Sequence, residues 1–551
     1  MSEEETTQRR SFLKGALTAP VALAAGSSLL APPQADAHGG RDNRWRKDHR
    51  NDDTVVKGPS TASEPYIAPS IAGVKAVSIL TVGEAATNGY RMVGIPDGLG
   101  AFVSGRNEFT LLMNHELTAA APGIVRGHGS NGAFVSRWTI DSKTLRVVKG
   151  EDFTKSPDNV FVWDKATAKY VRGTTQWQRH CSADLAAPNA YFAHGVGTRE
   201  RLYLNGEEVA SGRGWARVAT GEHAGEAWHL PLFGGLSFEN AVACPYPQRQ
   251  TIVALTDDSN QSTASVASGN SAPSQVYFYI GTKYAGRHPV DSAGLTNGKL
   301  YGVSIHRNGV LVPAESDQFG LGDATSGYNG AARFTLVPLA DEGGLTVSSN
   351  LDVISDAHGV ARLQRCEDGA WDPREGHQGD FYFVTTAAIN ANCRLWRLSF
   401  DNIEDPLAGG TVEILLRGDE GHRMMDNVAI DKLGRILMDE DPGNDNRIAK
   451  VWLYSIETEQ FLQVAAHNPV RFDPDSLQPE FITRDEETTG IIDAAAILGD
   501  GWFLLNVQAH KPSTDVELVE GGQLLALYVD PAIGLVPYED GNRHDDNQNR
   551  R

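Results

Sequence analysis

The sequence predicts an all-β protein, specifically a β-propeller of about six irregular blades with inserted loops and short helices. Short apolar runs rich in β-branched and aromatic residues recur along the chain, whereas strong helical periodicity is scarce. The 551 residues include 57 Gly and 26 Pro, which favour many turns over long helices. Six of the apolar runs share one layout, as expected for blades repeated around a common axis.

Each of these six runs stops abruptly at carboxylates, amides or hydroxyls. The runs and the polar residues after them are 109–113 with Glu116, 201–204 with Glu207 and Glu208, 251–255 with Asp257 and Asp258, 381–384 with Thr385, 435–438 with Glu440 and Asp441, and 502–505 with Asn506. Further strands are expected at 276–280, 299–305, 395–398, 451–455 and 524–529, separated by Gly, Asn and Asp turns.

A carboxylate that follows a buried strand is costly unless something pairs with it. If the six runs are the innermost strands of the blades, their acidic ends converge on one central channel, where mutual repulsion favours bound multivalent cations. Additional acidic or amide groups stand in separate positions, namely Glu239, Glu367, Asp426, Asn427 and Glu487. Their oxygens are hard ligands that suit Ca²⁺. The alternative is that acidic residues end strands simply because loops are polar.

The overall charge agrees with a protein that collects cations. Lys and Arg number 49 against 70 Asp and Glu, a formal net charge of −21. This balance argues against nucleic-acid partners, which are bound by neutralising phosphates. We find no zinc-protease signature, no Gly-x-Ser-x-Gly elbow and no P-loop.

The N-terminal segment of the chain predicts export. Residues 1–37 have the pattern of a twin-arginine signal peptide, with Arg9 and Arg10 before a mildly apolar stretch and a small-residue cleavage site. The apolar stretch is too short for a stable membrane anchor. We therefore expect the twin-arginine export machinery as a partner and a periplasmic or extracellular location. Residues 38–70 are expected to be a flexible charged leader, 71–538 the propeller domain and 539–551 a disordered tail.

Four cysteines follow the signal, at 181, 244, 366 and 393. An even number in an exported protein permits disulfides, but four in so long a chain do not make a disulfide scaffold. At least one cysteine could instead be a metal ligand.

Between about residues 75 and 530 the chain resembles the PhoX family of secreted alkaline phosphatases. The residues that carry this resemblance are, in order, Asn114-His115-Glu116, Cys181, Gly206-Glu207-Glu208, Gly234-Gly235-Leu236-Ser237-Phe238-Glu239, Thr256-Asp257-Asp258, Arg365-x-Glu367, Asp426-Asn427, Asp439-Glu440-Asp441, Glu487-Thr488-Thr489-Gly490 and Asn506-Val507-Gln508-Ala509-His510. The chain departs from the family pattern around Cys181, at Phe238 and after Gln508, which identifies it as a divergent member.

The resemblance implies a cluster of Ca²⁺ and Fe³⁺ in the propeller channel and hydrolysis of small phosphate esters at alkaline pH. It implies that Cys181 binds iron, that Arg365 contacts the phosphate and that Glu367 is a catalytic metal ligand. The complete set of expected metal ligands is Glu116, Cys181, Glu207, Glu208, Glu239, Asp257, Asp258, Glu367, Asp426, Asn427, Glu440, Asp441 and Glu487.

Two rival functions remain open at this point. A calcium-dependent propeller hydrolase of another class, lactonase or phytase-like, uses the same kind of carboxylate site. A non-catalytic exported binding propeller would use calcium only for stability. His115 is expected to be a structural hydrogen-bonding residue, and Trp177, Trp215 and Trp228 are expected to pack the blades. We expect a monomer.

Overall fold

Six short strands form a closed ring at the centre of the molecule. They are β4 (Pro96–Gly105), β10 (Ala183–Leu185), β16 (Gly235–Ala243), β22 (Cys366–Trp371), β26 (Met425–Ile430) and β30 (Glu486–Asp493). Each contacts the next one along the chain, and β30 contacts β4 to complete the ring. The computed structural model describes residues 54–259, 274–315, 332–339, 351–476 and 478–535.

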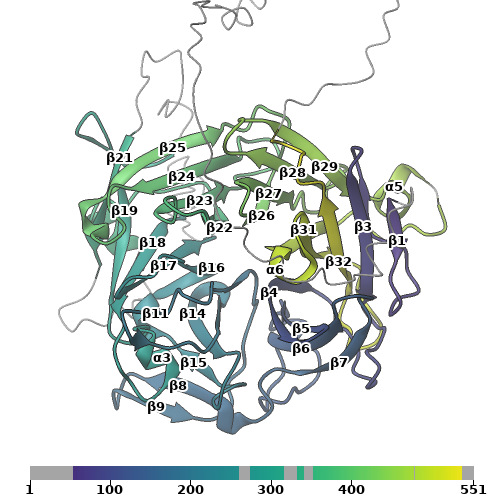
Figure 1. Cartoon of the computed structure of the whole chain (residues 1–551), viewed down its shortest axis with the longest axis horizontal. Coiled ribbons are helices and arrows are strands. Elements are labelled where there is room, and N and C mark those ends of the chain that lie inside the picture. The colour runs from purple at the N-terminus through teal and green to yellow at the C-terminus, as the bar shows by residue number, and fades with distance from the viewer. Residues whose placement is uncertain (1–53, 260–273, 316–331, 340–350, 477, 536–551) are drawn as a thin grey trace, which may run out of the picture. The chain divides into compact units, whose positions relative to one another are not determined.

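Each ring strand pairs on its outer side with an antiparallel second strand. The second strands are β5 (Glu108–His115), β13 (Leu202–Gly206), β17 (Gln250–Asp257), β23 (Asp380–Thr385), β27 (Arg435–Glu440) and β31 (Trp502–Ala509). The protein is therefore a β-propeller of six blades, as predicted (Figure 1). The six apolar runs singled out in the sequence are the second strands, not the innermost ones. They are the more hydrophobic because both of their faces are covered by neighbouring blades.

The outer strands differ from blade to blade. Blade 1 adds β6 (Phe134–Asp141) and β7 (Val147–Asp152), blade 4 adds β24 (Arg394–Phe400) and β25 (Gly410–Leu416), blade 5 adds β28 (Lys450–Ser455) and β29 (Phe461–His467), and blade 6 adds β32 (Gly521–Val529). Blade 2 is larger and adds β14 (Glu208–Val218), β15 (Ala227–His229), β8 (Val160–Asp164) and β9 (Lys169–Arg172). Blade 3 adds β18 (Val276–Thr282), β19 (Lys299–Arg307), β20 (Val310–Val312) and β21 (Ala332–Pro338). Ladders between β14 and β16 and between β21 and β25 join neighbouring blades, which makes them irregular.

Strands from the N-terminal part of the chain complete the last two blades. β3 (Val74–Thr81) pairs with β32, and β1 (Val55–Lys57) pairs with β3. β2 (Ile67–Pro69) pairs with β29 of blade 5. The expected flexible leader over 38–70 is therefore wrong for its described part, because these strands supply partners for otherwise open sheet edges. Residues 38–53, the expected signal peptide and the expected tail over 539–551 lie outside the described residues.

Among the described residues, α-helices are few and short, as expected. They are α3 (Pro289–Ser292), α4 (Leu351–Ala357), α5 (Pro469–Phe472) and α6 (Ala495–Leu498), with a further small hairpin formed by β11 (Phe192–Ala193) and β12 (Val196–Gly197). In the described part of the chain, no helix has the length and apolar character needed to cross a membrane.

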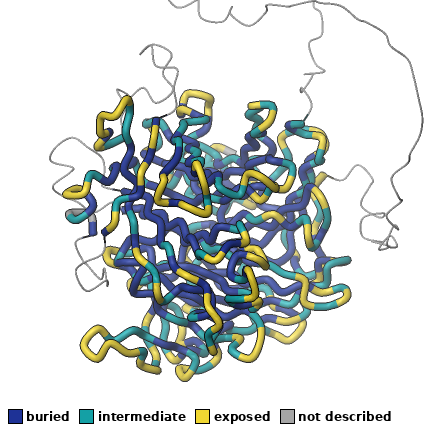
Figure 2. The backbone as a smooth tube through the Cα atoms, turned by 60° about the vertical axis from the view of Figure 1, so that its left-hand side comes forward, coloured by how far each residue is buried: buried dark blue, intermediate teal, exposed yellow. Residues whose placement is uncertain are grey.

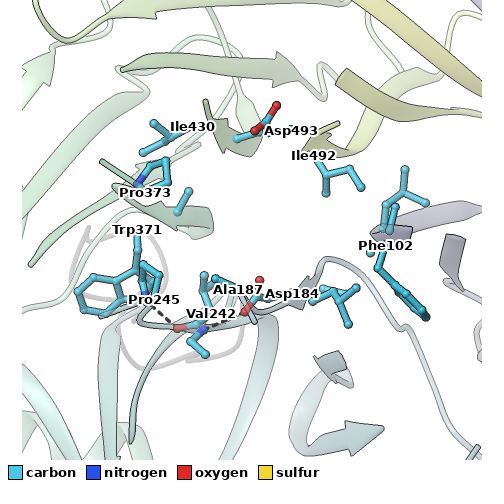
Figure 3. A pocket seen from close by; sticks show the side chains of 18 of the residues that line it. Phe102, Asp184, Ala187, Val242, Pro245, Trp371, Pro373, Ile430, Ile492 and Asp493 are labelled. Carbon is cyan, nitrogen blue, oxygen red and sulfur yellow. Dashed lines mark hydrogen bonds between the residues drawn. The ribbon is translucent and has the colours of Figure 1, made fainter. Parts of the chain in front are cut away.

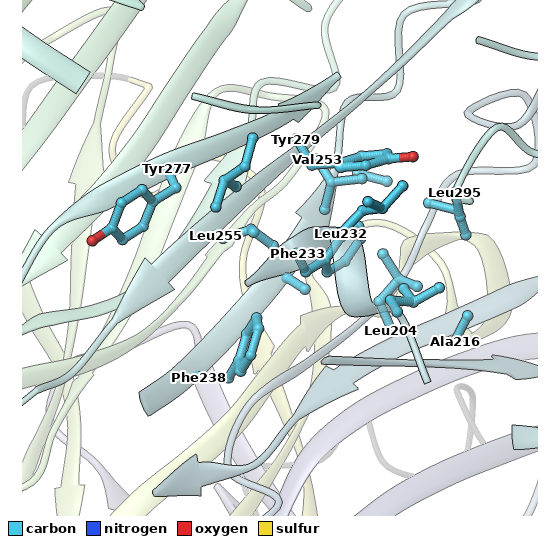
Figure 4. Packing of buried hydrophobic residues seen from close by; sticks show 14 of the residues in the cluster. Leu204, Ala216, Leu232, Phe233, Phe238, Val253, Leu255, Tyr277, Tyr279 and Leu295 are labelled. Carbon is cyan, nitrogen blue, oxygen red and sulfur yellow. The ribbon is translucent and has the colours of Figure 1, made fainter. Parts of the chain in front are cut away.

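The core consists of apolar layers between neighbouring blades, and the exposed residues lie mainly in loops (Figure 2). Figure 4 shows the layer between blades 2 and 3, where Leu204, Phe238 and Leu255 are fully buried. Trp177 and Trp215 pack edge to face with ring centroids 5.4 Å apart, and Trp228 stacks on Phe161, as expected of packing residues.

All four cysteines are buried and free, which excludes the disulfide alternative.

Candidate metal centre

One end of the ring encloses a small, strongly acidic cavity of about 270 Å³. Nine carboxyl side chains face it together with one thiol, two guanidinium groups and one imidazole. This carboxylate cavity is lined by Glu116, Arg179, Cys181, Glu208, Glu239, Asp258, Arg365, Glu367, Asp426, Asp441, Gly443, Asp485, Glu487 and His510. Ten of these residues belong to the site expected from the sequence.

The strand topology explains why residues so far apart in sequence meet here. A ring strand and its second strand run antiparallel, so the start of one lies beside the end of the other. Glu367, Asp426 and Glu487 are the second residues of ring strands β22, β26 and β30. Glu239 is the second residue of the part of β16 that pairs with β17. Glu116, Glu208, Asp258 and Asp441 follow the second strands β5, β13, β17 and β27 by one or two residues. Two tiers of carboxylates therefore face one space.

Two arginines neutralise part of this charge. Arg179 donates from Nε to Glu116 at 2.7 Å, and its Nη2 lies 2.7 Å from Glu208. Arg365 donates to Asp258 in a bidentate pair, from Nε at 3.0 Å and from Nη2 at 2.7 Å, and its Nη2 also lies 3.0 Å from Glu367. Arg365 has a backbone φ of +60°, a conformation uncommon outside glycine and enriched at functional sites.

The remaining carboxyls have no such partner, and their pKa values show the cost. Burial raises the pKa of Glu239, Asp426 and Glu487 well above the usual range, and the adjacent carboxylates raise it further. Burial also raises the pKa of Glu208 and Glu367 strongly, in spite of the neighbouring arginines. Without cations, this end of the ring is stable only if several of these groups are protonated.

Beneath the carboxylate cavity lies a further acid, Asp97. It accepts a hydrogen bond from the Cys181 thiol at 3.5 Å, and Gln508 donates to both Asp97 and Glu116, at 2.9 and 3.1 Å. Burial, with the nearby Glu116 carboxylate, raises the pKa of Asp97 to about 8. For Glu116, burial opposes ionisation, but Arg179 and Gln508 outweigh it and lower its pKa.

The donor atoms are close enough to hold metal ions. Potential ligand atoms lie within 4.8 Å of one another in three overlapping sets: Asp97, Glu116 and Cys181; Cys181, Glu208 and Glu239; and Glu239, Glu367 and Asp426. Two oxygens bound to one Ca²⁺ at about 2.4 Å lie at most about 4.8 Å apart, so the all-carboxylate set of Glu239, Glu367 and Asp426 fits calcium. The sets that contain Cys181 combine a soft sulfur with carboxylates and suit a transition metal such as iron. Burial, with Asp97 nearby, raises the pKa of this thiol, which a bound cation would reverse.

Four expected ligands do not face the carboxylate cavity, which corrects the sequence-based set. Glu207 is held by Arg213 at 2.5 and 2.7 Å, because successive residues of an extended chain point to opposite sides. Asp257 accepts from the Ser237 amide at 2.9 Å. Asn427 accepts from the Gly490 amide and donates to Ser182 at 2.7 Å. Glu440 pairs with Arg447 and with the Trp452 indole.

Other cavity residues escaped prediction. Arg179 and, beneath the cavity, Asp97 are single polar residues without a recurring pattern around them, and His510 was noted only as part of a longer motif. His510 Nδ1 lies 2.6 Å from Glu520; although burial opposes it, this carboxylate raises the pKa of His510 to about 9. His115, by contrast, is buried between Gly94 O and Ser136, a structural role as expected.

The opposite end of the ring forms a second cavity of about 830 Å³ (Figure 3). Apolar side chains dominate it, among them Phe102, Trp371 and Ile492. Asp184 also faces this second cavity and accepts from the Ala243 amide at 3.0 Å. Burial raises the pKa of Asp184 to about 7.

No protein-family model matches the chain, and neither does any curated protein sequence. Among solved structures, the chain is similar to PhoX from Pseudomonas fluorescens in complex with vanadate, a transition-state analogue, with a TM-score of 0.54, 12% identity, and coverage of 83% of this chain and 95% of that one. It also matches a protein of unknown function from Dyadobacter fermentans, with a TM-score of 0.39, 11% identity, and coverage of 83% of this chain and 100% of that one. An α-L-arabinofuranosidase from Fusarium graminearum matches with a TM-score of 0.38, 9% identity and coverage of 82% and 97%. At 12% identity, the similarity to PhoX shows the fold alone.

Proposed function

We propose that the protein is a metal-dependent hydrolase of small phosphate esters and that the carboxylate cavity is its active site. One observation carries the proposal: nine carboxyls, a thiol and two arginines face one small cavity on the axis of a propeller. The similarity in fold to PhoX, a protein solved with vanadate as a transition-state analogue, supports it. So does the resemblance of the site residues to the PhoX phosphatase pattern.

The chain provides ligands for hard cations next to groups that can bind an anion. When bound, Ca²⁺ and Fe³⁺ would act as Lewis acids that polarise phosphoryl oxygens and lower the pKa of bound water. Glu239, Glu367 and Asp426 would hold calcium, and Cys181 with Glu208 would hold iron. The arginines and carboxylates of the chain would position the substrate phosphate and the metals and balance their charge.

Arg365 is placed to bind the phosphate. Its Nε and Nη2 contact Asp258 and Glu367, and within the described part of the chain its Nη1 has no hydrogen-bond partner. A guanidinium group with one edge held by carboxylates presents its remaining N–H groups in a fixed direction, which suits a tetrahedral oxyanion. Arg179 is held in the same manner by Glu116 and Glu208 on another side of the cavity.

His510 is placed to donate a proton. It lines the carboxylate cavity and is held through Nδ1 by Glu520, which favours the imidazolium. A protonated imidazole can donate to the departing alcohol oxygen of an ester, which is the role of a general acid. We assign this role to His510.

The test is hydrolysis of p-nitrophenyl phosphate by the full chain loaded with Ca²⁺ and iron. We expect activity that disappears in Glu367→Gln, while Glu207→Gln, which alters a carboxylate outside the cavity, retains its metals and its activity. A panel of phosphodiesters, phytate and lactones separates the proposal from other propeller hydrolases. Lactone hydrolysis without phosphatase activity would contradict it.

The setting of this activity is also a proposal. We propose that the twin-arginine machinery recognises Arg9 and Arg10 and exports the protein to the periplasm or beyond. That route carries folded proteins and fits a site assembled from all six blades. Replacement of both arginines by lysine should keep a tagged full-length chain in the cytoplasm, which cell fractionation measures; unchanged export would contradict the proposal.

A further inference from the structure

Outside the carboxylate cavity, two histidines and a glutamate meet at the edge of blade 2. His223 and Glu226 belong to the loop between β14 and β15, and His288 is the residue immediately before α3. We propose that these three residues, here called the imidazole cluster, bind a divalent transition metal of the Zn²⁺ class. This site is separate from the carboxylate cavity and prefers a different kind of ion.

The geometry of the imidazole cluster is close to that of a metal site. His223 Nδ1 lies 3.0 Å from Glu226 Oε1, and His288 Nε2 lies 2.9 Å from Glu226 Oε2. One ligand atom from each residue lies within 4.8 Å of the other two. Ligands bound tetrahedrally to Zn²⁺ at 2.0–2.1 Å are separated by about 3.3 Å. Small side-chain movements therefore suffice to enclose an ion.

A second carboxylate stands beside the imidazole cluster. Glu200 lines the same 500 Å³ pocket as His223 and His288. Its Oε2 is buried and, among the described residues, has no hydrogen-bond partner. A buried oxygen without a donor is costly, and a cation nearby would satisfy it. Glu200 is thus the candidate fourth ligand, and the open side of the pocket leaves room for water or an exogenous group.

Surrounding residues hold the imidazole cluster in place. The Trp228 indole donates to Glu226 Oε2 at 2.8 Å, and its ring packs against His288 with centroids 4.4 Å apart. Such outer contacts orient the ligands of metal sites. The side chains of Glu226 and His288 are each 14% exposed, whereas that of His223 is 32% exposed and gives an ion access from solvent.

Metal binding requires one change of proton position. His288 Nδ1 accepts from the Val290 amide at 3.2 Å, so in the neutral ring the proton lies on Nε2 and faces Glu226. An ion at Nε2 displaces that proton to Nδ1, and the cap of α3 is then lost. Binding at the imidazole cluster should therefore loosen the start of α3, a response that a purely structural ion-pair network would not give.

The chemistry of the donors separates the two sites. The carboxylate cavity offers mainly oxygen ligands, which calcium accepts, whereas calcium binds imidazole poorly. Two imidazoles with carboxylates suit Zn²⁺ and similar ions. With the carboxylate cavity filled by excess Ca²⁺, added Zn²⁺ should occupy the imidazole cluster.

The experiment measures bound zinc on the full chain, stripped of metal and then equilibrated with excess Ca²⁺ and stoichiometric Zn²⁺. We expect the native chain to retain one Zn²⁺ per chain more than His223→Ala/His288→Ala. The control His194→Ala removes a histidine from the exposed β11–β12 turn and should bind zinc as the native chain does. Equal zinc content in the native and double-variant chains would overturn the proposal.

Cobalt gives a second readout that does not depend on the double variant. Co²⁺ bound to the native chain should show visible d–d absorption, and Glu226→Gln should weaken its binding at least tenfold while keeping the side-chain shape. Hydrogen exchange at the Val290 amide should become faster when the metal binds. Identical Co²⁺ titrations for the native chain and Glu226→Gln would overturn the proposal.

Discussion

The two ends of the six-stranded ring differ in chemistry although the same strands build both. β22 contributes Glu367 to the carboxylate cavity and Trp371 to the second cavity. β26 contributes Asp426 to one and Ile430 to the other, and β30 contributes Glu487 and Ile492 in the same way. These three ring strands therefore change from acidic to apolar within four or five residues.

This change assigns different tasks to the two ends. The apolar halves of the ring strands bury surface against neighbouring blades and stabilise the fold by the hydrophobic effect. The acidic halves oppose folding unless their charge is neutralised. The comparison teaches that the blades hold the carboxylates together at a cost that cations would remove, so stability should depend strongly on metals and pH through the acidic end and only weakly through the apolar end.

The largest expected effect is on the stability of the metal-free protein. Because the pKa of Asp97 is raised to about 8, and those of Glu239, Asp426 and Glu487 are also raised, the folded state binds more protons than the unfolded state above about pH 4. The free energy of unfolding should therefore fall as the pH rises towards 8, by about 1.4 kcal/mol per pH unit for each such group. Denaturant unfolding at several pH values measures this. Calcium should remove most of the slope, and a metal-free protein equally stable at pH 5 and pH 8 would contradict the expectation.

Next in size is the effect of changing a single carboxylate at the acidic end. Glu367→Gln should lower phosphatase kcat by at least a thousandfold, about 4 kcal/mol, because it removes charge from a site that depends on it. Steady-state kinetics and metal analysis on the same sample measure this. In Glu207→Gln the Arg213 pair is weakened, so stability should fall while kcat and metal content stay the same.

The Cys181→Ser variant separates the two metals. Loss of the thiol should remove iron but leave calcium, because only the sets that include sulfur favour a transition metal. Elemental analysis checks this. Cys244→Ser is the matched control, since Cys244 is buried away from the carboxylate cavity. Iron retained in full by Cys181→Ser would show that the thiol is not a ligand.

A smaller effect is expected from Arg365→Lys. Lysine keeps the positive charge but loses the planar fork, so kcat/KM should fall ten- to a hundredfold, about 1–3 kcal/mol. Arg213→Lys, outside the cavity, serves as the control. Kinetic constants equal to those of the native chain would exclude a phosphate contact for Arg365.

The smallest effect belongs to the apolar end. Burial raises the pKa of Asp184 to about 7, so its ionisation destabilises the folded state at higher pH. Asp184→Asn keeps an acceptor for the Ala243 amide and removes that charge, which should stabilise the protein by about 1–2 kcal/mol at pH 8 and by nearly nothing at pH 4. Activity should stay the same. Thermal unfolding at the two pH values measures the difference, and destabilisation at pH 8 would contradict the assignment.

The sequence predicted the fold well because turn residues and apolar runs are local signals. It assigned the six apolar runs to the innermost strands, whereas they form the second strand of each blade. The true ring strands, such as β22 and β26, mix acidic and apolar residues and lack a clear period. The carboxylates that meet in the cavity were found largely because they follow strands. Asp97 and Arg179 were missed because their roles depend on contacts between blades, which no local pattern encodes.

The same reasoning explains the expected ligands that face elsewhere. Glu207 and Glu208 are adjacent, and Asp257 and Asp258 are adjacent, yet only the second of each pair lines the carboxylate cavity. Alternation along extended chain requires one residue of such a pair to point away, but the sequence does not show which one.

The most direct measurement is the calcium and iron content of one purified preparation together with its rate of p-nitrophenyl phosphate hydrolysis before and after chelation. The account predicts that bound metal and activity fall together and that both return when the metals are restored. A folded, metal-free chain that hydrolyses the ester at the full rate would contradict it.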